Sequence, residues 1–166
     1  MKFLALITAT ILPMLGFVSA DCPPGAHVKT GTTPHCDCNP DGSITCAEFQ
    51  VCGVGNTGAT FVFEDTWTAT VQCQNKGGKI VEVKSTDQNT SNNRNLTPDE
   101  NGCLTVPGGT LSQPTDADFT SQATCPNGNW EKIVEGDSPT RTSFTYTLTL
   151  DDCPTTFTKL PNPCLA

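Results

Sequence analysis

The clearest pattern in the chain is an alternation of apolar and polar residues along two segments. From Trp67 to Cys73 the odd-numbered positions are apolar or cysteine, and the even-numbered positions are threonine or glutamine. Residues 144–150 alternate in the same way, with threonine at every second position. A period of two places successive side chains on opposite faces of a strand, so both segments are predicted to be half-buried β-strands.

Other segments carry strand and turn signals of the same kind. Strands are predicted at residues 43–46, 59–64, 79–84, 103–106, 119–125 and 130–135. Turns are predicted at residues 39–42 and 75–78, which are rich in asparagine and glycine. The polar residues 85–102 and 107–118 are predicted to be long exposed loops, and no helical period extends over three turns. The expected fold is all-β, a small disulfide-rich antiparallel sandwich or barrel.

The N-terminal residues have the pattern of an export signal. Lys2 precedes an apolar run that ends in the small residues of 18–20, where a signal peptidase would cleave. The run is interrupted by Pro13 and Gly16 and is shorter than a membrane-spanning helix requires. Residues 1–20 are therefore predicted to be a signal peptide, and residues 21–166 a single secreted, extracellular domain without membrane insertion.

Ten cysteines follow the predicted cleavage point, and they lie at Cys22, Cys36, Cys38, Cys46, Cys52, Cys73, Cys103, Cys125, Cys153 and Cys164. An even number in an exported chain predicts up to five disulfides, whose connectivity the sequence leaves open. Residues 21–55 hold five of these cysteines among prolines and glycines, with few large apolar side chains. This loop-rich subregion is expected to be held by its bridges and to precede a β-rich core at residues 56–166.

Metal binding is the alternative use of these cysteines. His27, His35, Cys36 and Cys38 are ligand types that zinc prefers. The Cys-x-Cys spacing differs from that of the usual zinc knuckle, and thiols of secreted chains are normally oxidised. No metal and no cofactor is predicted.

The charge balance limits the partners. The chain has 17 acidic residues against 9 lysines and arginines, a formal net charge of −8. Nucleic acids and anionic membrane surfaces bind clustered basic residues, so neither is expected as a partner.

Catalytic signatures are weak. A Gly-x-Ser-x-Gly motif is absent from the sequence, and both histidines lie in the cysteine-dense subregion, so no catalytic residue is predicted. Glycoside hydrolysis needs only two facing carboxylates. The acidic residues on or near predicted strands are Glu64, Asp65, Glu82, Glu131 and Glu135. They are interpreted as ordinary solvent-facing charge, although paired-carboxylate catalysis stays open as an alternative.

Two asparagines and one tryptophan are candidate modification or ligand sites. Asn89 and Asn95 begin Asn-x-Ser/Thr sequons in the predicted polar loop and are candidate glycosylation sites. Trp130 follows a turn and could be displayed to a polysaccharide, whereas Trp67 and Tyr146 lie on apolar strand faces and are predicted to pack in the core.

In size, cysteine content, acidity, richness in threonine, asparagine and glycine, and lack of a catalytic motif, the mature chain resembles the small secreted cysteine-rich proteins of filamentous fungi and oomycetes. Several of these proteins act as effectors or elicitors at host surfaces. The resemblance implies a non-enzymatic protein that is bound by a host extracellular receptor or a cell-wall component. The alternatives are a small cell-wall polysaccharide hydrolase and a polysaccharide-binding module.

Overall fold

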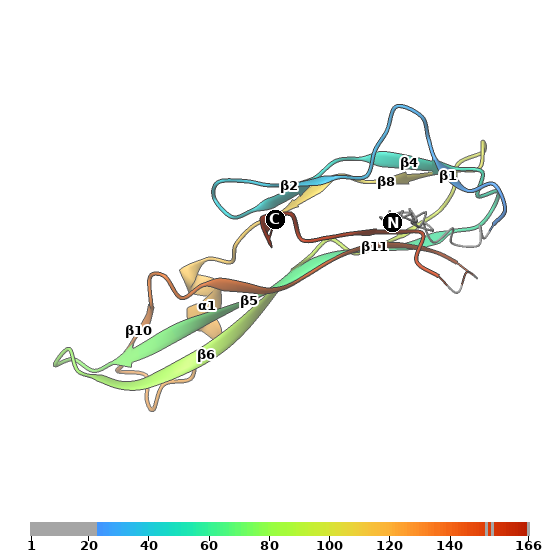
Figure 1. The fold of residues 1–166 in the computed structure, drawn as a ribbon. Coiled ribbons are helices and arrows are strands. Elements are labelled where there is room, and N and C mark those ends of the chain that lie inside the picture. The colour runs from blue at the N-terminus through green and yellow to red at the C-terminus, as the bar shows by residue number, and fades with distance from the viewer. Residues whose placement is uncertain (1–22, 152, 154, 166) are drawn as a thin grey trace, which may run out of the picture.

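The computed structural model describes residues 23–151, 153 and 155–165. The predicted signal peptide at residues 1–20 and Cys22 lie outside the described residues. Figure 1 shows two layers of strands on one half of the molecule and a long hairpin covered by a helix on the other.

The larger layer is an antiparallel sheet built around one long strand, β5 (Ala59–Gln74). Along one side of β5 run β6 (Ile80–Ser91) and β7 (Arg94–Leu96). Along its other side run β11 (Thr140–Leu150) and β10 (Glu131–Val134), and β12 (Thr158–Leu160) pairs with β11. The strands predicted at residues 59–64, 67–73, 79–84, 130–135 and 144–150 are confirmed as parts of this sheet.

The second layer consists of two small antiparallel sheets. One contains β1 (His27–Val28), β4 (Phe49–Cys52) and β8 (Cys103–Val106). The other contains β2 (Cys36–Cys38), β3 (Ile44–Cys46) and β9 (Gly109–Leu111). A short 3-10 helix, η1 (Pro163–Leu165), ends the described chain. The layers pack face to face, so the predicted antiparallel, disulfide-rich all-β fold is confirmed.

The main core lies between the two layers and follows from the alternation of β5 and β11. Every odd-numbered residue of β5 is buried and every even-numbered one is at least partly exposed. Phe61 and Phe63 pack edge-on against Tyr146, and the opposite layer contributes Ile44 and Phe49. The cysteine-dense segment therefore supplies large side chains to a shared core.

The prediction of a strand at residues 119–125 is wrong, because residues 116–122 form the helix α1 (Asp116–Gln122). Thr115 caps this helix: its side chain accepts from the Asp118 backbone N–H, and the Asp118 carboxylate accepts from the Thr115 N–H. These reciprocal bonds form a capping box, which satisfies backbone donors that a helix start leaves unpaired. The helix buries Phe119 in a second core cluster with Trp67 and Val71.

The two predicted loops are also partly wrong. Residues 85–91 continue β6 and residues 94–96 form β7, because β5 is long enough to supply hydrogen-bonding partners to both segments. Within residues 107–118, residues 109–111 form β9 against β3. Polar composition alone therefore did not distinguish a loop from a strand with one exposed face.

Candidate functional site

Four disulfides join described residues, and they confirm the predicted disulfide framework. The bridges are Cys36–Cys46, Cys38–Cys164, Cys52–Cys103 and Cys73–Cys125. Cys153 is also disulfide-bonded, and no cysteine among the described residues is free. Cys38–Cys164 links residues 126 positions apart, from β2 to η1, so it constrains most of the described chain.

The residues considered for metal binding have other contacts. Cys36 and Cys38 are both oxidised in disulfides. The exposed rings of His27 and His35 each place Nδ1 at a nearby backbone carbonyl oxygen, 2.7 Å from Gly25 and 3.0 Å from Thr33 respectively. In the part of the chain that the structure describes, no group of three or more His, Cys, Asp or Glu is arranged to hold a metal ion.

The five candidate carboxylates are spread over the large sheet. Glu64 lies in β5, and Glu82 lies in β6 opposite Cys73 of β5. The two residues are therefore about 30 Å apart along the direction of the strands. Glu82 is opposite Cys73, so its side chain lies on the face of the sheet that α1 covers. Glu131 is opposite Gln74, so its side chain lies on the other face of the sheet. Glu135 follows β10 and is exposed. The register therefore separates most of these carboxylates by distance or by the thickness of the sheet.

Asp65 differs from the other four carboxylates, and its interpretation as solvent-facing charge is wrong. Its side chain is fully buried, on the same face of β5 as the core residues. Arg141 Nε donates to Asp65 Oδ2 over 2.7 Å, and Trp67 Nε1 donates to the same oxygen over 3.0 Å. Thr90 donates its hydroxyl to the other oxygen. Three donors from three strands therefore hold the carboxylate.

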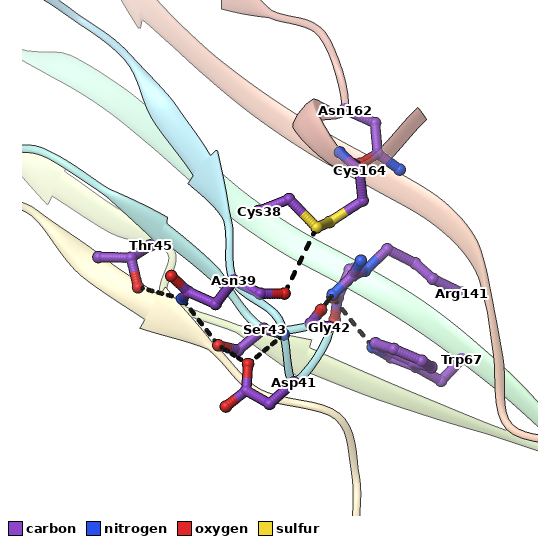
Figure 2. The surroundings of a disulfide bond; sticks show 11 residues. Cys38, Asn39, Asp41, Gly42, Ser43, Thr45, Trp67, Arg141, Asn162 and Cys164 are labelled. Carbon is purple, nitrogen blue, oxygen red and sulfur yellow. Dashed lines mark hydrogen bonds and ion pairs between the residues drawn. A yellow bond between two sulfur atoms is a disulfide. The ribbon is translucent and has the colours of Figure 1, made fainter. Parts of the chain in front are cut away.

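Arg141 connects this buried pair to the second layer. Its Nη2 donates to the Gly42 carbonyl oxygen over 2.6 Å, and its guanidinium lies 4.3 Å from the centroid of the Trp67 ring. Figure 2 shows the end of the Arg141 side chain beside both Trp67 and the turn that contains Gly42, in the surroundings of the Cys38–Cys164 bridge. A guanidinium over an indole face gains from the ring quadrupole as well as from its hydrogen bonds.

The turn that receives Arg141 is itself tightly hydrogen-bonded. Gly42 has a φ of 78°, which favours glycine. The Asp41 carboxylate accepts from the Ser43 hydroxyl and backbone N–H over 2.7 and 2.9 Å, and these bonds lower the pKa of Asp41. The predicted turn at residues 39–42 is thus confirmed, and Arg141 docks it onto the large sheet.

The sequence did not lead to a prediction of this cluster, although the alternation of buried and exposed residues along β5 contained a signal for it. Asp65 shares its odd-numbered face with Phe63 and Trp67, so the alternation already placed a carboxylate in the core. A buried carboxylate requires a cationic or hydrogen-bonding partner. Asp65 is enclosed and holds Arg141, and Arg141 in turn donates to Gly42 of the second layer, so the cluster joins the two layers.

Trp130, the predicted ligand contact, borders a surface depression of about 360 Å³ between the end of α1 and β10. The lining residues are Ser121, Ala123, Thr124, Cys125, Asn127, Gly128, Trp130 and Lys132. Trp130 is half-buried, and Lys132 donates to the Thr120 carbonyl oxygen over 2.9 Å. The depression thus combines an indole ring with hydroxyl, amide and ammonium groups.

The two sequon asparagines are both exposed, but on strands and not in a loop. Asn89 lies in β6 opposite Thr66, and Asn95 lies in β7 opposite Thr60. Their glycosylation stays a prediction. The packing predicted for Trp67 and Tyr146 is confirmed, since both are buried.

Comparison with protein-family models, curated proteins and solved structures yields no match for this chain. Within the described residues, no helix is long and apolar enough to cross a membrane. The case for a function therefore depends on the chain's own residues.

Proposed function

We propose that this chain is a secreted, non-enzymatic protein that acts outside the cell by being bound at a host surface, in the manner of effector- and elicitor-like proteins. The main support is the state of the candidate carboxylates: Asp65 is enclosed by Arg141, Trp67 and Thr90, and the other four are spread over the sheet. Recognition requires only a rigid display, which the disulfides and the shared core supply.

The test is to apply purified protein to host tissue and to score cell death or defence responses. Glu64→Gln, Glu82→Gln, Glu131→Gln and Glu135→Gln should each change the response no more than a few-fold. Protein that has been reduced and alkylated should lose the response, because each native bridge contributes about 2 to 5 kcal/mol to a domain of this kind. A folded single carboxylate variant that loses activity by orders of magnitude would instead establish catalysis.

A polysaccharide-binding module is the second candidate, and the depression at Trp130 favours it. Sugars stack their C–H faces on indole rings, while their hydroxyls need nearby donors and acceptors. Trp130 supplies the ring, and Thr124 and Asn127 supply polar groups in the same depression.

Retention on insoluble chitin, cellulose and β-glucan, measured with and without the Trp130 ring, tests this candidate. Trp130→Ala should abolish retention on the polymer that is bound, while Trp130→Phe should preserve part of it. Wild-type protein that none of these polymers retains, or an alanine variant that is retained equally, would contradict polysaccharide binding through Trp130. Neither result would affect receptor recognition.

A further inference from the structure

The outer edge of β6 is open for pairing. In the described part of the chain β6 pairs with β5 alone, and it extends over 12 residues without proline or glycine. Figure 1 shows this strand at the border of the long hairpin, with α1 over the face of the sheet. Open strands of this length present unpaired N–H and C=O groups that template pairing with another strand.

The alternation of the ladder shows which residues of β6 present those groups. The Phe63 N–H donates to Asn93 Oδ1 and its carbonyl accepts from the Asn92 N–H, so odd-numbered residues of β5 direct their backbone groups toward β6 and β7. Their partners in β6 from Lys84 to Thr90 are even-numbered. The odd-numbered residues, Val83 among them, therefore direct their N–H and C=O groups to the open edge.

Apolar and charged side chains meet at the same end of this edge. Ile80, Val81 and Val83 are among the most exposed large apolar residues described, at 46%, 41% and 54%. Glu82 and Lys84 flank Val83, project from the opposite face of the strand, and form an ion pair with each other. Val83 is thus preceded by a negative side chain, Glu82, and followed by a positive one, Lys84.

We propose that two copies of this chain associate by pairing β6 with β6 in antiparallel register, with the two-fold axis at Val83. In that register the Val83 residues exchange both backbone hydrogen bonds, and Lys84 of each copy stands opposite Glu82 of the other. Opposite charges directly across a ladder favour pairing, and like charges disfavour it. The dimer joins the two large sheets into one continuous sheet.

Charge complementarity selects this register among those that the edge allows. With the axis at Ser85, Lys84 would stand opposite Thr86 and gain no partner. With the axis at Asp87, two carboxylates would meet at the centre. With the axis at Val81, Glu82 would stand opposite Ile80. The Val83 register matches both charges and brings the two exposed Val83 side chains side by side.

Charge reversal tests the proposal because Lys84 of each copy is opposite Glu82 of the other, so that reversing either charge places like charges opposite each other. Sedimentation equilibrium of the secreted protein should give a concentration-dependent monomer–dimer equilibrium. Lys84→Glu, and separately Glu82→Lys, should each raise the dimer dissociation constant by about tenfold or more, because like charges then face each other twice. The double variant, Glu82→Lys with Lys84→Glu, recreates opposite pairs and should recover most of the affinity.

Lys159→Glu is the matched control, since it makes the same change in net charge at an exposed position of β12, which β5 and β11 separate from β6. It should leave the dissociation constant within about twofold of wild type. A monomer at all accessible concentrations overturns the proposal. So does a double variant that associates no better than the single variants, or a Lys159→Glu variant that is as impaired as Lys84→Glu.

Discussion

Replacing Arg141 by methionine removes the cation that is paired with the buried Asp65. The substitution keeps most of the apolar stem of the side chain and deletes the bonds to Asp65 and Gly42, together with the contact on Trp67. The side chains of Asp65 and Arg141 are 0% and 8% exposed, so water cannot readily replace the lost partner. Removing one member of such a pair costs about 3 to 5 kcal/mol, a large part of a typical stability of about 5 to 15 kcal/mol.

A second substitution separates the buried charge from the lost contacts. Asp65→Asn in the Arg141→Met background removes the uncompensated charge and keeps an oxygen that accepts from Trp67 and Thr90. The double variant should therefore lose only about 1 to 3 kcal/mol, less than Arg141→Met alone.

Urea unfolding with the disulfides intact measures these differences, followed by tryptophan fluorescence because Trp67 belongs to the cluster. Arg94→Met is the matched control: Arg94 is exposed on β7 and bonds to Asn92, so its loss should change stability by no more than about 0.5 kcal/mol. A loss of less than about 1 kcal/mol for Arg141→Met, or a double variant that loses the full sum of the two single effects, would contradict a buried ion pair that stabilises the fold.

Two further predictions concern the core and the helix. Burial raises the pKa of Tyr146, the single tyrosine, to about 12, so its contribution to stability is complete below about pH 10 and is lost as the pH rises toward 12. Tyrosinate absorbance should therefore titrate near 12 in folded protein and near 10 in reduced, unfolded protein, and coincident titrations would contradict the burial. Thr115→Ala should destabilise the protein by about 1 kcal/mol in thermal unfolding, with Thr115→Ser close to wild type, because the capping box needs a hydroxyl. Equal melting temperatures for the alanine and serine variants would contradict the role of the cap.

Several features of the fold were predictable because they depend on local spacing. The alternation at residues 67–73 and 144–150 places apolar side chains on one face of any strand that forms, and the structure has both strands. The turn at residues 39–42 is confirmed for a similar reason, since an asparagine and a glycine at fixed offsets favour it wherever it occurs.

The local sequence pattern was not sufficient to predict the helix α1 or the full length of β6. Residues 119–125 alternate like a strand, but the Thr115–Asp118 capping box and the burial of Phe119 against Trp67 favour a helix. Residues 85–91 are polar like a loop, but β5 offers them a complete hydrogen-bonding edge. In both cases a partner distant in sequence changes the balance between two local conformations of similar free energy.

The sequence by itself determined that this is a disulfide-rich β protein with an apolar face on the strands at residues 67–73 and 144–150, because side-chain periodicity and cysteine number need no knowledge of pairing. Only the tertiary structure decided that Asp65 meets Arg141, 76 residues away, and that Cys38 meets Cys164. It also decided that β6 pairs on one side only among the residues that the structure describes. These outcomes depend on which strands become neighbours, and that choice is set by the packing of the whole core.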